Sequence, residues 1–365
     1  MAEANNHRIA TLHSPAGWLL FLLAVTAVLL LMPVLNRVVP PESAFHVPNW
    51  MLTLTGRFLC LALVALALDL IWGYTGILSL GHGAFFALGG YVMGMHLTRN
   101  SYADGGVPNF IQFLGVSEWP WFWVPFQWFW FTALMILVVP GLLAFLFGFF
   151  AFRSRVRGVY FAIITQALTF GMMLLFFRTE TGVGGDTGLT NFQTLLGFSV
   201  RDADTRLALY LISALAVIGG YLLCRYIVTS KLGRVLTAIR DGESRVRFTG
   251  YNPLRYKLFV WTLSAMLCGV AGALYVPQTG VINPGEMAPA QSIEMAVWVA
   301  LGGRGTLVGA LAGAGIVNGM KSYVTAVYPD LWLFFLGALF IIVTLFLPRG
   351  VVGLFQRVRG ARGRS

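Results

Sequence analysis

Two acidic residues whose side chains could bind a solute or carry a proton lie inside long apolar stretches of this chain. Asp69 falls in LALVALALDLIWGY and Glu294 in AQSIEMAVWVA. A charged side chain at the centre of a bilayer costs about 2.5–3.5 kcal/mol on insertion scales, so it usually faces a partner or a cavity. Both are therefore candidates for a translocation pathway. The alternatives are that Asp69 pairs with a basic loop near the headgroups, and that Glu294 is interfacial or caps a short helix.

A glycine-rich run from Gly73 to Gly94 reads GYTGILSLGHGAFFALGGYVMG. Its small residues recur every three or four positions, which predicts a helix with one bare face that lets backbones approach closely. Plain helix packing is the alternative interpretation. Ser79 and His82 are harder to dismiss, because an unbonded polar group in hydrocarbon costs several kcal/mol. The repeating small positions are Gly76, Ser79, Gly83, Ala87, Gly90 and Gly94.

Uncharged hydrogen-bonding groups occur on another apolar stretch, where Gln166 lies between Thr165 and Thr169. Such groups suit a neutral amide solute better than a charge does. The complete set of candidate pathway residues is Ser79, His82, Gly83, Gln166, Glu294 and Asp69.

The composition explains what must position these residues. Of the 365 residues, 58% are hydrophobic and only 11% charged, whereas soluble domains carry about 25% charged residues. The chain is therefore predicted to be an all-α polytopic membrane protein with about ten transmembrane or re-entrant helices. The predicted segments are 17–35, 53–72, 77–98, 121–151, 158–177, 207–227, 257–277, 291–303, 306–326 and 331–347.

Two of these segments are irregular. Residues 76–98 are rich in glycine, and 291–303 is shorter than the roughly 20 residues that a spanning helix needs. Broken segments at membrane depth are tolerated only where they are buried in protein or face a wet cavity. Both segments are candidates for re-entrant or pathway-lining elements.

The net charge of +11 is unevenly distributed along the chain. Three segments, 153–157, 225–257 and 349–364, hold 16 of the 25 basic residues. With ten spans all three fall on one side, which the positive-inside rule assigns to the cytoplasm together with both termini. The basic excess thus reflects orientation in a lipid bilayer, and nucleic-acid binding is not predicted.

The longest basic loop, Thr229–Lys257, contains an amphipathic pattern. Leu232, Leu236 and Ile239 share one face of a predicted short helix, and Asp241-Gly242 is a plausible stop. One interpretation is an interfacial helix bound to anionic lipid. The favoured one is a lever that transmits movement from a partner to the spans.

Two motifs carry a family resemblance. LSLGHGAFFALGGY and the later VALGGRGTLVGALAGA resemble permease subunits of ABC importers for branched-chain amino acids and for urea. TGVGGDTGLTNFQTLLGF, at 181–198, is most similar to the urea-type subunit. The resemblance implies one permease domain over 1–365 with a cytoplasmic coupling loop at about 228–257. The coupling residues it implies are Leu232, Gly233, Arg234, Ile239, Asp241 and Gly250.

The same resemblance implies partners and a location. The partners are a homologous second permease, two cytoplasmic ATPases and a periplasmic solute-binding protein, in a bacterial inner membrane. The polar loop 179–190 is a candidate surface for docking the binding protein. The chain has no GxxxxGK[ST] phosphate-binding motif of its own, so ATP hydrolysis is expected on the partner subunits.

The function predicted on this basis is ATP-driven import of urea or a related small amide, by a transport subunit that is not an enzyme. Neither a cofactor nor a metal site is predicted. The alternatives are a branched-chain amino acid permease, and a stand-alone channel or proton-coupled transporter in which Asp69 or Glu294 carries the proton.

Overall fold

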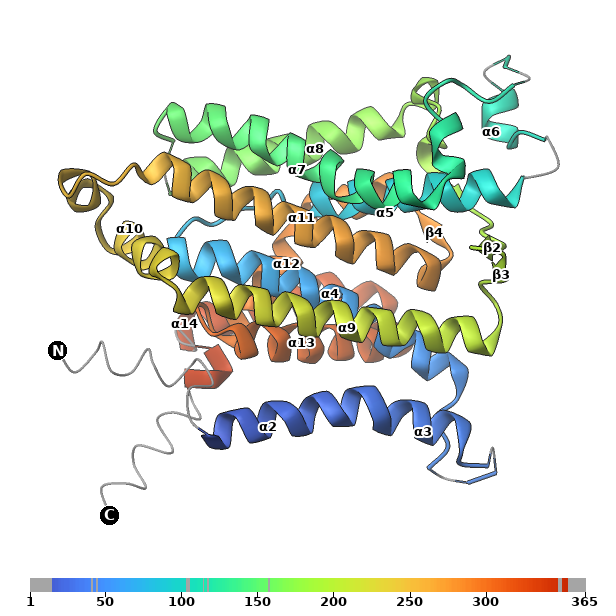
Figure 1. The fold of residues 1–365 in the computed structure, drawn as a ribbon, viewed down its shortest axis with the longest axis horizontal. Coiled ribbons are helices and arrows are strands. Elements are labelled where there is room, and N and C mark those ends of the chain that lie inside the picture. Colours follow the sequence, from blue (N-terminus) through green and yellow to red (C-terminus); the bar gives the residue numbers. More distant parts are fainter. Residues whose placement is uncertain are drawn as a thin grey trace.

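The computed structural model describes residues 15–353, apart from 41, 44, 103–105, 114, 117, 157 and 347–349. The long helices lie side by side with their connections gathered at the two ends of the molecule (Figure 1). Their bounds are α2 Pro15–Thr26, α3 Met32–Arg37, α4 Asn49–Thr75, α5 His82–Ser101, α7 Phe129–Arg153, α8 Val159–Phe177, α9 Ala203–Thr229, α10 Lys231–Phe248, α11 Pro253–Thr279, α12 Pro289–Gly302, α13 Leu307–Val327 and α14 Trp332–Phe346.

Short elements complete the described chain. A π-helical turn, Ala27–Leu31, joins α2 to α3, so that Gly17–Arg37 forms one apolar helical segment. The remaining short elements are α6 Asn109–Gln112, η2 Val124–Gln127, η3 Thr179–Thr181, η4 Gly185–Thr187, η5 Pro284–Met287, η6 Pro329–Leu331, β1 Leu189–Thr190, β2 Thr194–Leu195, β3 Phe198–Ser199 and β4 Val281–Ile282.

Six of the described helical segments are long and apolar enough to cross a membrane, and shorter or less apolar helices accompany them. All ten predicted segments coincide with helical segments of the structure. The prediction of an all-α polytopic membrane protein is therefore confirmed. Helices α4 and α11 are the most enclosed of the six candidates, and α11 packs against α4, α5 and α7.

Close packing of α5 on α11 depends on absent side chains. A Cβ atom on Gly89 would overlap the carbonyl group of Gly269, and one on Gly272 would overlap the carbonyl of Phe86. Helices α12 and α13 meet in the same way, where a Cβ on Gly302 would overlap the carbonyl of Gly309. The bare-face prediction is thus right in kind, but the tightest contact of α5 is at Gly89, outside the predicted set of small residues.

Two boundaries differ from the prediction. The predicted span 77–98 becomes helical only at His82, because Gly76 adopts a φ of 74° that ends α4 in a left-handed cap. Residues 121–128 form turns and the 3-10 helix η2 before α7 begins at Phe129. Here Trp123 is fully buried and its Nε1–H donates to the carbonyl of Gly182 at 3.1 Å. It therefore stabilises a contact between two connecting segments.

The connections separate into two groups, one at each end of the helices. One end carries α10 and the turns after α7 and α12, whereas the other carries α6 and the two small antiparallel sheets, β1 with β4 and β2 with β3 (Figure 1). The basic residues of α10 lie at the first end. The predicted cytoplasmic termini and most of the basic C-terminal segment lie outside the described residues, as does Arg157.

Candidate functional site

A non-helical segment at residues 76–81 precedes α5, and α8 holds it in place. The backbone N–H of Leu80 donates to Thr165 Oγ1 at 3.1 Å, and Thr169 Oγ1 donates to the carbonyl of Leu80 at 3.2 Å. Irregular backbone at membrane depth needs such partners, since lipid offers none. The two threonines that flank Gln166 therefore have a definite role: they satisfy the backbone of the break.

His82, the first residue of α5, is the centre of a buried polar group. Its Nε2 lies 2.8 Å from Ser264 Oγ, and its Nδ1 lies 3.2 Å from Ser79 Oγ. Ser264 in turn donates to the carbonyl of Ala67 at 2.5 Å. The ring also meets the indole of Trp261 edge-on, with centroids 5.7 Å apart. The imidazole thus connects the break before α5 to both central helices, α4 and α11.

The starts of α5 and α12 lie next to each other. A Cβ on Gly83 would come within 2.7 Å of Ser292 Oγ and 3.2 Å of the carbonyl oxygen of Glu286. Neither helix has a side-chain cap at its N-terminus. Helix N-termini carry partial positive charge and unpaired N–H groups, so this junction is suited to an anionic group.

Unsatisfied polar atoms are found at the start of α12 and on α8. Ser292 Oγ and both polar atoms of the Gln166 side chain are buried without a hydrogen-bond partner among the described residues. A buried polar group without a partner costs about 1–3 kcal/mol. These groups are therefore available to a solute or to water when the junction opens.

Glu294 is neither interfacial nor a helix cap, in contrast to the alternatives considered for it. It is the sixth residue of α12, its side chain is only 4% exposed, and its carboxylate accepts from Lys321 Nζ of α13 at 2.8 and 3.1 Å. The Lys321 ammonium lies 5.8 Å from the ring centroid of Trp332. This ion pair fixes α12 to α13.

Asp69 lies in a separate place, at the turn between α12 and α13. Its side chain is fully buried, and Oδ1 accepts from the backbone N–H of Gly305 at 2.7 Å. Tyr74 donates to the carbonyl of the same glycine at 3.0 Å. The carboxylate thus bonds a backbone N–H of the α12–α13 turn, and the charge of Arg304 in the same turn acts on it.

Helix α10 contacts this turn region through one arginine. Arg240 Nη1 donates to the carbonyl of Gly73 at 2.8 Å, and a Cβ on Gly73 would overlap the backbone of Gly305. A continuous set of contacts thus runs from α10 through the end of α4 to the α12–α13 turn. Arg240 was not among the predicted coupling residues, since its partner is a backbone group that the sequence does not identify.

The predicted coupling residues divide between two faces of α10. Gly233 and Ile239 are buried and Leu232 is half-buried, whereas Arg234, Asp241 and Gly250 are exposed. The apolar face therefore packs inward, and only the second group is accessible to a partner in this conformation. The exposed surface also includes Phe248, whose side chain is 92% exposed, an aromatic that the sequence analysis did not single out.

The first helical part of α10 ends at the predicted stop, Gly242, whose backbone angles are not helical (φ 179°, ψ 85°). A second helical part, which the sequence did not predict, continues to Phe248. Ser230 begins the helix with its side-chain oxygen accepting from the N–H of Leu232 at 3.1 Å. The Asp241-Gly242 pair thus produces a kink between two helical parts, because the second part has contacts of its own that hold it.

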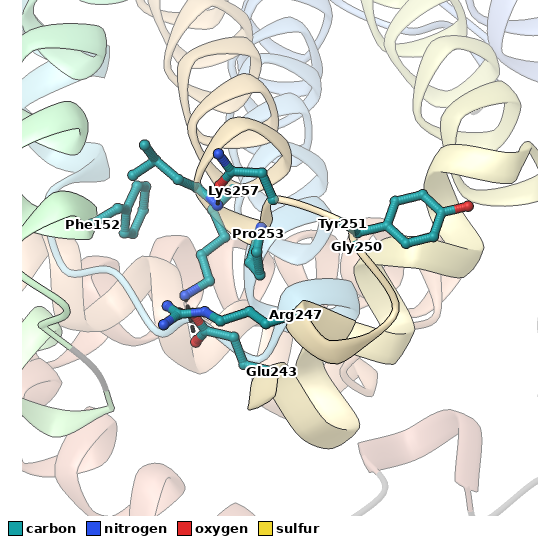
Figure 2. Close-up of a pocket in the computed structure, with 9 residues that line it drawn as sticks. Phe152, Glu243, Arg247, Gly250, Tyr251, Pro253 and Lys257 are labelled. Atoms are coloured by element: carbon teal, nitrogen blue, oxygen red, sulfur yellow. Dashed lines mark hydrogen bonds and ion pairs between the residues drawn. The ribbon is translucent and has the colours of Figure 1, made fainter. Parts of the chain in front are cut away.

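Those contacts surround a small cavity of about 270 Å³ between α10, α11 and the end of α7. The carboxylate of Glu243 lies 2.8 Å from a nitrogen of Arg247 and 2.8 Å from Nζ of Lys257, and Figure 2 shows both cationic groups meeting at this carboxylate. The Lys257 ammonium also lies 5.7 Å from the ring centroid of Phe152. Tyr251 points away from this group in Figure 2. The ion pairs attach the second part of α10 to the start of α11.

The structure thus assembles four of the sequence candidates into one group and leaves Asp69 and Glu294 at separate positions. Ser79, His82 and Gly83 lie together at the break before α5, with Gln166 on the adjoining helix α8. Asp69 is at the turn near α10, and Glu294 is paired within α12 and α13. Ser264 and Ser292 were missed, because an isolated serine in an apolar stretch carries no signal until its neighbours are known.

Comparison with known proteins identifies the class. Residues 50–344 match the family model described as "Branched-chain amino acid transport system / permease component". The chain therefore belongs to this family of ABC importer permeases.

Individual relatives are similar over most of the chain. The branched-chain amino acid permease LivM of Escherichia coli is 25% identical over 316 residues, covering 80% of this chain and 67% of the relative. LivH of Salmonella typhimurium is 26% identical over 314 residues, covering 80% and 91%. A fructose import permease, FrcC of Rhizobium meliloti, is 33% identical over 91 residues, covering 24% and 25%. No solved structure matches the chain.

These matches bear on the two solutes considered from the sequence. The relatives that cover most of the chain are named for branched-chain amino acids, and none of the three supports a urea-type subunit. The amino acid alternative fits these matches better than the urea interpretation does.

Proposed function

We propose that this chain is the membrane-spanning permease subunit of an ATP-driven importer for branched-chain amino acids. Residues 1–365 form its single permease domain. It acts with a second, homologous permease, two cytoplasmic ATPases and an extracytoplasmic solute-binding protein. The family match and the relatives named for this transport support the proposal.

The observation that carries the proposal is the set of contacts that begins on α10. Arg240 bonds the carbonyl of Gly73, Gly73 packs on Gly305, and Gly305 donates to Asp69. A movement of α10 caused by an ATPase is therefore transmitted directly to α4 and the α12–α13 turn. Elements joined by close backbone contacts move together, as domain closure requires.

The orientation follows from charge. Helix α10 contains five basic residues and lies in a loop that the positive-inside rule assigns to the cytoplasm. The exposed groups Arg234, Asp241 and Phe248 form the face for the ATPase. The sheets and α6 then face the outside, where a binding protein docks.

The junction of α5 and α12 supports an amino acid as the solute. Two uncapped helix N-termini meet there, and their partial positive charges favour a carboxylate over the neutral urea molecule. Ser292 and Gln166 supply unpartnered hydrogen-bonding groups beside it. The proposed cycle opens this junction alternately to the two sides, with the states biased by their different affinities for the loaded binding protein.

The proposal is tested by uptake into liposomes that contain this chain with its partner subunits. We expect uptake of radiolabelled leucine to require ATP on the side of the membrane that carries the ATPases. It should also require the binding protein on the opposite side. Equal uptake of urea, with no leucine uptake, would refute the assigned solute. Accumulation by this chain alone along a pH gradient would instead favour the proton-coupled alternative.

The coupling step is tested by the variant Arg240→Gln, which removes the charge-assisted hydrogen bond to Gly73. Such bonds contribute about 1.5–3 kcal/mol, so we expect leucine uptake to fall about tenfold or more while ATP hydrolysis continues. Arg153→Gln is the matched control, since Arg153 is exposed at the same end and its cation contacts Phe149 of its own helix at 5.7 Å. Equal effects of the two variants would contradict the assigned route.

A further inference from the structure

A second and larger cavity, of about 630 Å³, lies at the end of the molecule opposite α10. It is enclosed by the first turns of α4 and α9, the end of α11, and the segments around Asn191 and Val200. It is distinct from the junction of α5 and α12, because none of the residues that line it belongs to either helix.

Three arginines line this cavity, and no acidic residue does. Arg57 is committed to the fold: its Nε and Nη2 donate to the carbonyl of Gln278 at 3.0 and 2.6 Å. Among the described residues, Arg201 and Arg206 have no acidic partner within 4 Å. The nearby Asp204 pairs with Arg37 instead. Two guanidinium groups therefore remain available beside the cavity.

The helix ends add to this positive character. Helices α4 and α9 both start at the cavity, and neither has a side-chain cap at its N-terminus. The C-terminal carbonyl groups of α11 would oppose them, but Arg57 occupies the carbonyl of Gln278. Asp202 and Asp204 at the start of α9 oppose this effect, and Asp204 is paired with Arg37, so the positive charge at the cavity comes mainly from the arginines.

The rest of the lining is mixed. Leu54, Phe192, Leu209 and Pro277 supply apolar groups, whereas Thr53, Asn191, Gln278 and Thr279 are polar. Guanidinium groups bind carboxylates and phosphates in a bidentate manner. The pocket therefore places an oxyanion subsite beside a group of apolar side chains.

We infer that this cavity binds an oxyanion group carried on an apolar body, with Arg201 and Arg206 holding the oxyanion. Two sources offer this chemistry, namely the phosphate of an anionic phospholipid in the outer leaflet and the carboxylate of a free aliphatic acid. The inference does not depend on which solute the importer carries.

The test uses the purified full-length chain, delipidated in detergent, and its variant Arg201→Gln/Arg206→Gln. One arm measures retention of phosphatidylglycerol against phosphatidylcholine by native mass spectrometry. A second arm titrates 3-methylbutanoate calorimetrically. Arg57 is left unchanged because it holds α11, and Arg178→Gln serves as the control, since Arg178 is an exposed arginine outside the cavity at the same end of the molecule.

We expect one of the two probes to bind the wild-type chain and the control equally, and to bind the double variant at least about tenfold more weakly. Selective loss of phosphatidylglycerol assigns the lipid source, and selective loss of 3-methylbutanoate assigns the free acid. Failure of both probes to bind, or equal binding to wild type and double variant, overturns the inference. Weaker docking of the binding protein to the double variant, without binding of either probe, would assign the arginines to protein contact and also overturn it.

Discussion

The two sides of α5 differ in the way they contact their neighbours. Against α11 the helix packs backbone to backbone, at Gly89 on Gly269 and at Phe86 on Gly272. Against α8 the segment before its start is held by the hydroxyl groups of Thr165 and Thr169, whereas Ser292 Oγ of α12 and the Gln166 amide of α8 are unpartnered. The α5–α11 interface leaves no space for the backbones to shift. At the α5–α8–α12 junction, a hydroxyl group can change its hydrogen-bond partner at a small cost in free energy. We therefore propose that the α5–α11 crossing is a rigid element and that the α5–α8–α12 junction is the moving part.

The largest expected effect concerns the ion pair that anchors the moving part to α13. Glu294→Ala leaves the Lys321 ammonium without its carboxylate, and breaking a buried pair in this way costs about 3–5 kcal/mol. Because the Lys321 side chain is 31% exposed, we expect a loss near the lower end, about 3 kcal/mol. The measurement is thermal unfolding of the purified chain in detergent.

A second variant gives this prediction a control. Glu294→Ala/Lys321→Met removes both charges, and it should recover most of the lost stability, since no unpaired charge remains. If the single variant unfolds at the wild-type temperature, the pair does not hold α12 against α13, and Glu294 returns to being a candidate for solute or proton contact.

The next effect tests the fixed side of α5. Gly89→Ala places a Cβ against the carbonyl of Gly269, so the helices must separate, and overpacking of this kind costs about 1–3 kcal/mol. Gly171→Ala on α8 is the matched control, because a Cβ there has nothing within 4 Å. Equal thermal stability of the two variants would show that the α5–α11 crossing is not the rigid element argued above.

The smallest expected loss of stability is on the polar side. Thr165→Val keeps the shape of the side chain but removes the acceptor for the N–H of Leu80, at a cost of about 1–2 kcal/mol. Because Thr165 holds the segment before α5, we expect the uptake rate to fall by more than the loss of folded protein alone would cause. Uptake by the assembled importer, compared with that of Thr132→Val on α7, measures the difference. A transport loss no greater than that of the control would place the moving part elsewhere.

Much of the fold could be predicted because the bilayer restricts what a chain can do. Apolar length gave the ten helical segments, and glycine spacing together with the short 291–303 segment indicated where helices break. The same reasoning failed at 121–128, and it missed the second helical part of α10 that follows the stop at Gly242. In both places a contact with another segment decides the outcome, Trp123 with Gly182 in one case and Glu243 with Lys257 in the other.

The candidate site was predictable by residue type but not by partner. Ser79 and His82 were identified because polar groups in hydrocarbon must be satisfied, and the structure supplies Ser264 and Thr165 as the groups that complete the break. Arg240 and Ser292 could not be found in this way, because each takes its importance from a neighbour on another helix.

The sequence by itself determined that this chain is a helical membrane protein, which side of it is basic, and which helices are broken, because composition and local spacing set the cost of leaving water. Only the tertiary structure decided that Glu294 pairs with Lys321, that Asp69 bonds the backbone of Gly305, and that the apolar face of α10 turns inward. Hydrogen bonds and ion pairs between residues far apart in the chain depend on how the helices cross, and that geometry is set by packing of the whole molecule.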